Sequence, residues 1–188
     1  MNYEQIISDL KSKKYASTYF LAGEETYYID LISNYIENHV LSDANKGFNQ
    51  SILYGRDVEV NALISAAKQF PMMSENTVII IKEAQELKKI EELTSYIQQP
   101  LSSTILVLCY RGKKLDKRKA LYKSLQKNGL YFESNKLYEN KIPGWIKKYL
   151  VERDYTIGVK SAAMLTEFLG NDLSKIAGEL NKLRILVE

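Results

Sequence analysis

Hydrophobic positions along this chain alternate between the spacing of a helix and that of a buried strand. Apolar residues recur every three or four positions from residue 3 to residue 13 and again from about residue 25 to residue 40, which predicts two amphipathic helices. Between them lies the continuous apolar segment "STYFLA", which has the length of a strand. The chain is therefore expected to begin with a helix, a strand and a second helix.

The alternation continues to about residue 134. Further strands are predicted at "NQSILY", "NTVIIIK", "STILVLCY" and "YFES". Helices are predicted between them, at about residues 57–70, 87–98 and 116–127, with Asp57 and Asp116 as amino-terminal caps. Such apolar strands, alternating with helices, indicate an α/β fold with a parallel five-stranded sheet covered by helices on both faces.

The strand signal ends near residue 138. Three helical segments follow, "IPGWIKKYLVERD", "VKSAAMLTEFLG" and "DLSKIAGELNKLRILVE", and Pro143 suits the first turn of its helix. We therefore expect two domains, an α/β domain over residues 1–138 and a small three-helix domain over residues 139–188. Because the sequence stops at Glu188 without a capping signal, we also expect it to be a piece of a longer protein.

Composition narrows the class of protein. Of the 188 residues, 45% are hydrophobic and 26% are charged, as in ordinary globular domains. No apolar run has membrane-spanning length, and the charged amino terminus does not resemble a signal peptide. The single cysteine, Cys109, lies inside "TILVLCY", so we expect a reduced core residue in a cytoplasmic protein rather than a disulfide or a cysteine-based metal site.

The stretch "FLAGEETYYID", residues 20–30, passes from a strand through a glycine into a helix, as in proteins that bind phosphates at such a turn. A phosphate loop also needs a lysine and a hydroxyl, but Gly23 is followed by "EET". The third strand should end in a metal-binding aspartate, and Lys82 stands there instead. Both losses argue against ATP hydrolysis, and we interpret the glycine as allowing a tight turn, with the glutamates favouring a helix start.

Other catalytic chemistry finds little support in the sequence. His39 is the only histidine, near the end of a predicted helix and without a neighbouring ligand set, so we interpret it as a surface residue. No zinc, EF-hand or catalytic-triad motif occurs. We therefore predict no catalytic residues, no metal, no cofactor and no enzymatic activity of this chain by itself.

Positive charge is concentrated in one segment, although the net charge is only +3. Residues 111–127 contain eight lysines and arginines against one aspartate. Three lysines recur at every fourth position and predict a cationic row on one helix face. The row comprises Lys119, Lys123 and Lys127. Such a row is either an ordinary solvated face or a contact for DNA phosphates or an acidic partner, and both interpretations remain open.

The connection "KQFPMMSEN" is unusually apolar for a loop between a helix and a buried strand. Phe70, Met72 and Met73 surround Pro71, which stiffens the turn. These side chains either fold back onto the core or protrude as a knob for another protein's apolar pocket. Methionine suits the second use because its flexible side chain adapts to irregular pockets.

The chain resembles the delta-subunit family of the bacterial DNA polymerase III clamp loader, over nearly its whole length. The segments that carry this resemblance keep the family's order and spacing. They are "YFLAGEETYYID", "FN" at residues 48–49, "QFPMMSENTVIIIKEA", "LDKRKALYKSLQKNG" and "LGNDLSKIAGELNKL". Where aromatic residues or leucine are common in the family's apolar loop, this sequence has Met72 and Met73.

The resemblance implies the first two domains of such a subunit: an AAA+-like domain (the P-loop NTPase-like fold) without ATP binding, then a helical lid domain. The family's carboxy-terminal collar, which contacts the other loader subunits, would lie outside this chain. The implied partner is the ring-shaped sliding clamp (the beta subunit), bound through Phe70, Pro71, Met72 and Met73 and opened for loading onto primed DNA. The resemblance further implies DNA replication, a place in the cytoplasmic replisome as a non-catalytic subunit of a DNA-directed DNA polymerase, and no membrane contact. We expect the chain alone to be a monomer.

Two other functions compete with clamp binding. An active AAA+ ATPase would bind nucleotide at the turn after the first strand. A DNA-binding module would use the predicted helix over residues 116–127, and its affinity would fall steeply with salt.

Overall fold

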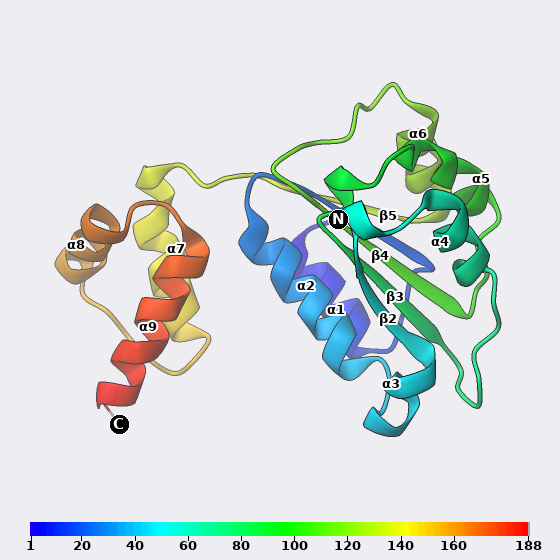
Figure 1. Cartoon of the computed structure of the whole chain (residues 1–188). Coiled ribbons are helices and arrows are strands. Elements are labelled where there is room, and N and C mark those ends of the chain that lie inside the picture. Colours follow the sequence, from blue (N-terminus) through cyan, green and yellow to red (C-terminus); the bar gives the residue numbers. More distant parts are fainter. Residues whose placement is uncertain (188) are drawn as a thin grey trace. The chain divides into compact units, whose positions relative to one another are not determined.

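The computed structural model describes residues 1–187 (Figure 1). The chain divides into two compact units, Met1–Ser134 and a second unit that begins at Asn135. From the sequence, we expected the division after residue 138.

The first unit contains one parallel sheet. Within the described residues its five strands lie in the order β2-β3-β4-β1-β5. The strands are β1 (Thr18–Gly23), β2 (Gln50–Tyr54), β3 (Thr77–Lys82), β4 (Thr104–Arg111) and β5 (Leu130–Ser134). The helices are α1 (Tyr3–Lys11), α2 (Thr26–His39), α3 (Asp43–Asn49), α4 (Val60–Ala67), α5 (Leu93–Gln98) and α6 (Ala120–Asn128). The predicted α/β architecture is confirmed.

Helices cover both faces of this sheet because successive strand side chains point to opposite sides. On β1, Tyr19 and Leu21 join the core formed with α1 and α2. Phe20 and Ala22 join the core formed with α4, α5 and α6. Figure 1 shows the two layers of helices on either side of the strands. Each fully buried large apolar side chain stabilises this arrangement by roughly 1.5–3 kcal/mol.

Several helix bounds differ from the predictions. The helix expected from residue 57 begins at Val60, and Asp57 lies in a 3-10 turn, Gly55–Asp57. Only Leu93–Gln98 forms a regular helix in the 87–98 region, since 3-10 turns at Ala84–Glu86 and Ile90–Glu92 precede it. The helix expected from Asp116 begins at Ala120.

Helix α3 was not predicted. Its seven residues, DANKGFN, contain no repeating apolar face, and its only buried residue is Asn49. The helix leads directly into β2. Hydrophobic periodicity could not reveal a helix whose one inward side chain is polar.

The second unit is helical. It contains a 3-10 turn at Glu139–Lys141 and the helices α7 (Ile142–Val151), α8 (Val159–Leu169) and α9 (Leu173–Val187). Pro143 lies in the first turn of α7, as predicted. The Asp172 carboxylate accepts a hydrogen bond from the Lys175 backbone amide at 3.0 Å and so caps the amino terminus of α9.

Candidate functional site

The apolar connection between α4 and β3 protrudes from the first unit. Phe70 is 77% exposed, Met72 is 62% exposed and Met73 is 99% exposed. Pro71 is partly buried. Of the two interpretations that the sequence left open, the structure supports a knob rather than a lid on the core. We call residues 70–73 the apolar tip.

The backbone of the tip is held in an uncommon conformation. Met73 has φ 53°, in the left-handed region that residues other than glycine seldom adopt. This conformation costs about 1–2 kcal/mol, so it requires support from neighbouring contacts. Backbone strain of this kind is concentrated at functional segments, and here it coincides with the most exposed apolar side chain of the tip.

Asn49 supplies that support from the end of α3. Its Nδ2 donates to the Met72 carbonyl oxygen at 2.9 Å, and its Oδ1 accepts from the Met72 backbone amide at 2.7 Å. The residue is only 2% exposed. Because one side chain satisfies both backbone groups of Met72, it fixes the position of the tip against α3.

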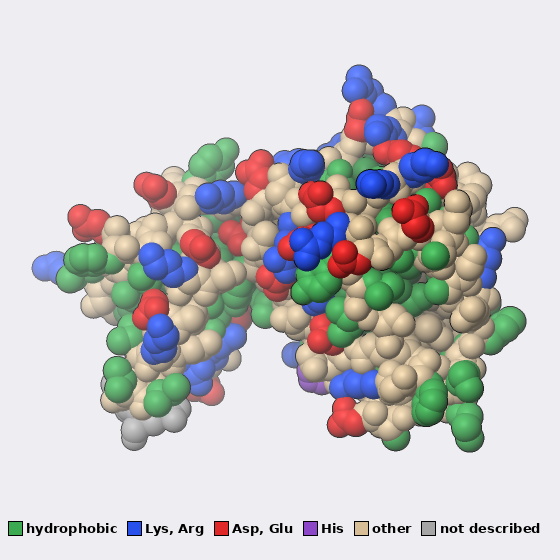
Figure 2. All heavy atoms as spheres, in the orientation of Figure 1, with side chains coloured by type: hydrophobic (Ala, Val, Ile, Leu, Met, Phe, Trp, Pro, Cys, Tyr) green, Lys and Arg blue, Asp and Glu red, His purple; other side chains and the backbone are tan. Residues whose placement is uncertain are grey.

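The tip lies at the end of the sheet where the parallel strands begin. Helix α3 runs into β2, the tip's connection runs into β3, and Gln50 pairs with Val78 in the parallel register. Figure 1 shows α3 and the connection into β3 at the same end of the first unit. In Figure 2, apolar side chains gather on the surface over these two segments.

The turn after β1, where nucleotide-binding proteins hold phosphates, lies at the opposite end of the sheet, where the strands end. Gly23 has φ 134°, and a Cβ there would lie 1.9 Å from the Ser134 carbonyl oxygen. The Glu25 amide donates to that same oxygen at 3.3 Å. Close approach of β5 therefore explains the glycine without any phosphate.

Glu25 occupies the amino terminus of α2 with its own negative charge. The residue is 5% exposed, and its Oε1 accepts a hydrogen bond from the Tyr27 backbone amide at 3.0 Å. A helix amino terminus attracts anions, and in phosphate-binding folds the bound phosphate takes this role. Here a carboxylate of the chain accepts the hydrogen bond, whereas Glu24 is exposed.

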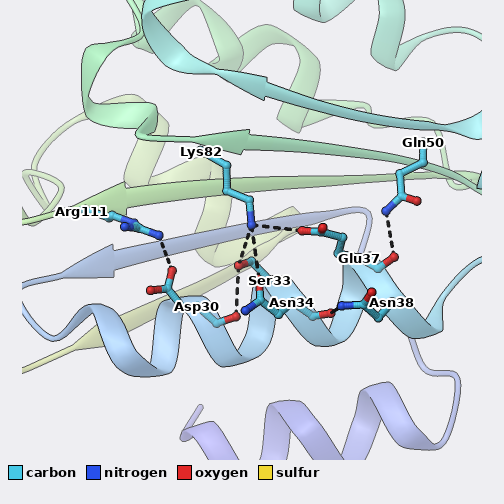
Figure 3. Close-up of polar contacts among 8 residues, drawn as sticks. All are labelled: Asp30, Ser33, Asn34, Glu37, Asn38, Gln50, Lys82 and Arg111. Atoms are coloured by element: carbon cyan, nitrogen blue, oxygen red, sulfur yellow. Dashed lines mark hydrogen bonds and ion pairs between the residues drawn. The ribbon is translucent and has the colours of Figure 1, made fainter. Parts of the chain in front are cut away.

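Basic side chains at the ends of β3 and β4 pair with α2 (Figure 3). The Lys82 ammonium lies 3.2 Å from Glu37 Oε2 and also contacts Ser33 and Asn34. Arg111 pairs with Asp30 in the same view. Burial raises the pKa of Asp30, while the Arg111 charge acts in the opposite direction. Lys82, at the position expected for a magnesium-binding carboxylate, thus forms an ion pair within the chain, beside the pair of Arg111 and Asp30.

Most of the basic segment is neutralised locally. Lys114 and Lys117 both pair with Glu133, at 3.0 and 3.3 Å. Lys119 precedes α6 and pairs with Glu91 at 2.6 Å. Asp116 accepts from the Arg118 amide instead of capping the helix.

Two lysines of the predicted row remain together on α6. Lys123 and Lys127 are exposed and line an open hollow with Gln98, Ser124 and Asn128. Within residues 1–187 neither forms an ion pair. The predicted row of three is therefore reduced to two free cations, while Leu121 and Leu125 face the core.

The remaining candidate groups have structural roles. His39 is exposed and stacks on Tyr35 with ring centroids 4.4 Å apart. Cys109 is buried in β4, and burial raises the pKa of its thiol to about 11. Among the described residues, no cluster of histidine, cysteine and acidic side chains could hold a metal ion. Over the same residues, no helix combines the length and apolar character needed to cross a membrane.

Comparison with known protein families shows which family contains this chain. The family model described as DNA polymerase III, delta subunit matches residues 19–135. The chain belongs to this delta-subunit family. The matched segment includes both the apolar tip and the turn after β1.

Individual relatives agree with this assignment to the delta-subunit family. The chain is 31% identical over 184 residues to DNA polymerase III subunit delta of Bacillus subtilis strain 168, covering 93% of this chain and 53% of that protein. It thus spans about half the length of this curated relative. The solved DNA clamp loader delta protein of Bacillus subtilis has a TM-score of 0.81 and 28% identity, covering 99% of this chain and 58% of that one.

More distant structures show the fold that the delta-subunit family shares with other proteins. The RuvB Holliday junction branch migration motor of Thermotoga maritima has a TM-score of 0.52 and 17% identity, covering 95% of this chain and 58% of that one. The fold is therefore AAA+-like, as predicted. At this identity the likeness concerns the fold alone.

Sequence reasoning did not foresee how the tip of this delta-subunit family member is held. In the sequence, Asn49 stands out only as part of "FN" before the second strand. A polar residue directly before an edge strand was the available signal, but its partner lies 23 positions away in the chain. Hydrogen bonds at such a separation follow from the fold and not from local pattern.

Proposed function

We propose that this chain is the clamp-binding part of a clamp loader in DNA replication. Phe70, Pro71, Met72 and Met73 bind the ring-shaped sliding clamp, which is then opened for loading onto primed DNA. The observation that carries the proposal is the exposure of the tip, at 77%, 62% and 99% for its three large side chains, in a member of the delta-subunit family.

The energetics of binding favour a tip that acts as an anchor. Burying three such side chains contributes roughly 5–8 kcal/mol. Association of two proteins costs about 4–15 kcal/mol in lost translational and rotational freedom. The tip therefore anchors the complex, but further contacts with the clamp are required for a stable one.

Opening of the ring follows from differential binding. A ligand shifts a conformational equilibrium only if it binds one state more strongly than the other. We infer that the tip enters a clamp pocket near a subunit interface and fits the distorted interface better than the closed one. The ring is then less favourable to close.

The chain performs this role without hydrolysing ATP. Glu25 supplies its own carboxylate to the amino terminus of α2, and Lys82 replaces the metal-binding carboxylate at the end of β3. A cation at that position repels magnesium. ATP hydrolysis would belong to other loader subunits, whose rearrangement would expose or hide the tip.

The arrangement of the whole protein follows the same proposal. The unit Met1–Ser134 is the AAA+-like domain and the helical unit that begins at Asn135 is the lid domain, with the contacts to other loader subunits made by a collar outside this chain. The protein acts in the cytoplasm as a non-catalytic subunit of the polymerase holoenzyme.

The test is a binding measurement with the cognate sliding clamp. Immobilised clamp should capture the wild-type chain and lose capture of the Met72→Ala, Met73→Ala double variant. Met164→Ala is a matched control, because this methionine is 56% exposed on α8, away from the tip's sequence. Wild-type capture by the double variant, with an intact fold by circular dichroism, would reject the proposal.

Titration calorimetry with ATP and magnesium tests the second part. We expect no heat of binding for the chain alone. Saturable binding with magnesium dependence would instead support the active ATPase.

A contact with DNA is a second candidate, supported by the two free cations on α6. Lys123→Glu with Lys127→Glu should weaken any affinity for primed DNA and reduce its salt dependence. Capture by the clamp should not change in this variant, which separates the two functions. Lys119 is expected to contribute less, because it already pairs with Glu91.

A further inference from the structure

A second exposed apolar side chain lies beside the residue that holds the tip. Phe48 is 78% exposed at the end of α3 and directly precedes Asn49. An exposed phenylalanine has no evident role in the stability of the first unit. Its position places it next to the only side chain that hydrogen-bonds the Met72 backbone in residues 1–187.

The Asn49 side chain joins the end of α3 to the tip by bonding both a backbone carbonyl and a backbone amide, as a neighbouring strand does. Its carboxamide donates to the Met72 carbonyl and accepts from the Met72 amide, at 2.9 and 2.7 Å. Its Nδ2 also donates to the Asn45 carbonyl oxygen at 3.2 Å, which orients the carboxamide from within α3. The Asn49 carboxamide thus bonds its own helix through Nδ2 and the tip through both Nδ2 and Oδ1.

Met73, which has the left-handed backbone conformation, is the next residue after Met72, whose backbone Asn49 holds. Met73 has a φ of 53°, and its own side chain is 99% exposed. A loop without these hydrogen bonds would sample several conformations. Fixing the binding conformation in advance removes part of the ordering cost of association.

We propose that the clamp-binding surface has two segments, in which Asn49 positions the apolar tip and Phe48 adds a further contact. This inference rests on the proposed function. Neither segment, residues 48–49 or residues 70–73, contains a charged side chain. Nearby, Lys46 is paired with Asp43 at 2.8 Å. An uncharged surface of aromatic and thioether side chains fits an apolar protein pocket and not a nucleic-acid backbone.

A second contact segment would also supply part of the binding free energy that the tip alone does not provide. The tip alone does not offset the cost of association comfortably, so other contacts must come from residues close to it. Phe48 is a large exposed apolar residue next to Asn49, and the Asn49 hydrogen bonds hold this part of α3 against the tip.

The test measures binding kinetics of single variants on the immobilised cognate clamp. Asn49→Ala should weaken affinity about tenfold, the effect of losing one to two neutral hydrogen bonds, mainly by slowing association. Phe48→Ala should weaken affinity about tenfold, mainly by faster dissociation. Asn45→Ala, the same change one turn earlier in α3, is the matched control and should bind as wild type.

Hydrogen exchange supplies a readout that a merely structural role would not give. The Met72 amide should exchange faster in Asn49→Ala, whereas the amides of β3 should keep their protection. If Asn49→Ala does not fold, Asn49→Asp keeps the size and the acceptor for the Met72 amide but loses the donor, and the same loss of affinity is expected.

The outcomes separate the two proposals. If the wild-type chain binds, the tip variant does not, and the variants at Phe48 and Asn49 bind like Asn45→Ala, this inference is overturned and the proposed function stands. No capture of the wild-type chain overturns both.

Discussion

The ammonium group of Lys82 lies 3.2 Å from a carboxylate oxygen of Glu37, joining the end of β3 to the last turn of α2. In ATPases of related fold, the end of this strand carries an acidic residue that holds magnesium. Here a cation of the chain itself takes that place, and its counter-ion is a residue of the adjacent helix. The pair is partly buried, with exposed side-chain fractions of 17% and 29%.

Breaking this pair should destabilise the first unit. Lys82→Met leaves Glu37 without its cation, so the free energy of unfolding should fall by about 1 kcal/mol. Chemical denaturation measures the change. The double variant Lys82→Met, Glu37→Gln should lose less than the sum of the single variants, because neither then leaves a charge unpaired. Strict additivity would mean that the pair contributes nothing to stability.

Gly23 should not tolerate a side chain. An alanine Cβ would lie 1.9 Å from the Ser134 carbonyl oxygen, and φ is 134°. We expect Gly23→Ala to lower the free energy of unfolding by roughly 3 kcal/mol or more. Gly47→Ala is the matched control, since no atom lies within 4 Å of its Cβ and α3 should gain about 0.5–1 kcal/mol. Equal stability of the two variants would contradict the close approach of β5.

Stability should depend on pH through Glu133. The hydrogen bond from Lys114, followed by that from Lys117, holds the pKa of Glu133 below its ordinary value of 4.5. The ionised carboxylate therefore stabilises the fold above pH 4.5, and this contribution is lost as the pH falls through the lowered pKa. Glu133→Gln should be less stable than wild type by roughly 0.2–1 kcal/mol at pH 7. The difference should vanish in acid, and thermal unfolding across this range would show it; a difference independent of pH would contradict the assignment.

The Cys109 thiol should be unreactive in the folded protein. It is fully buried in β4, and burial raises its pKa to about 11, so almost no thiolate is present at pH 8. A thiol reagent such as DTNB should label the native chain only slowly and the denatured chain at once. Rapid labelling of the native chain would place the cysteine outside the core.

The sequence was informative where hydrophobic pattern and backbone chemistry act locally. The apolar run "TVIII" predicted a strand buried on both faces, and Pro143 lies in the first turn of its helix, where its fixed φ is favourable. The sequence was less informative where a polar group forms its hydrogen bonds with residues outside the expected local pattern. Asp116 and Asp57 looked like helix caps, but the backbone amides near them are used in turns, so the helices begin three or four residues later.

By itself, then, the amino-acid sequence determined the two helical layers around a parallel sheet, the helical second unit and the lack of a phosphate-binding lysine. Only the tertiary structure decided that the tip protrudes, that Asn49 holds it, and that Glu91 and Glu133 pair with three lysines of the basic segment. The physical reason is the range of the interactions. Periodicity and capping depend on residues within a few positions, whereas the exposure of Met73 and the pairing of Lys82 depend on segments that meet only after the sheet has formed.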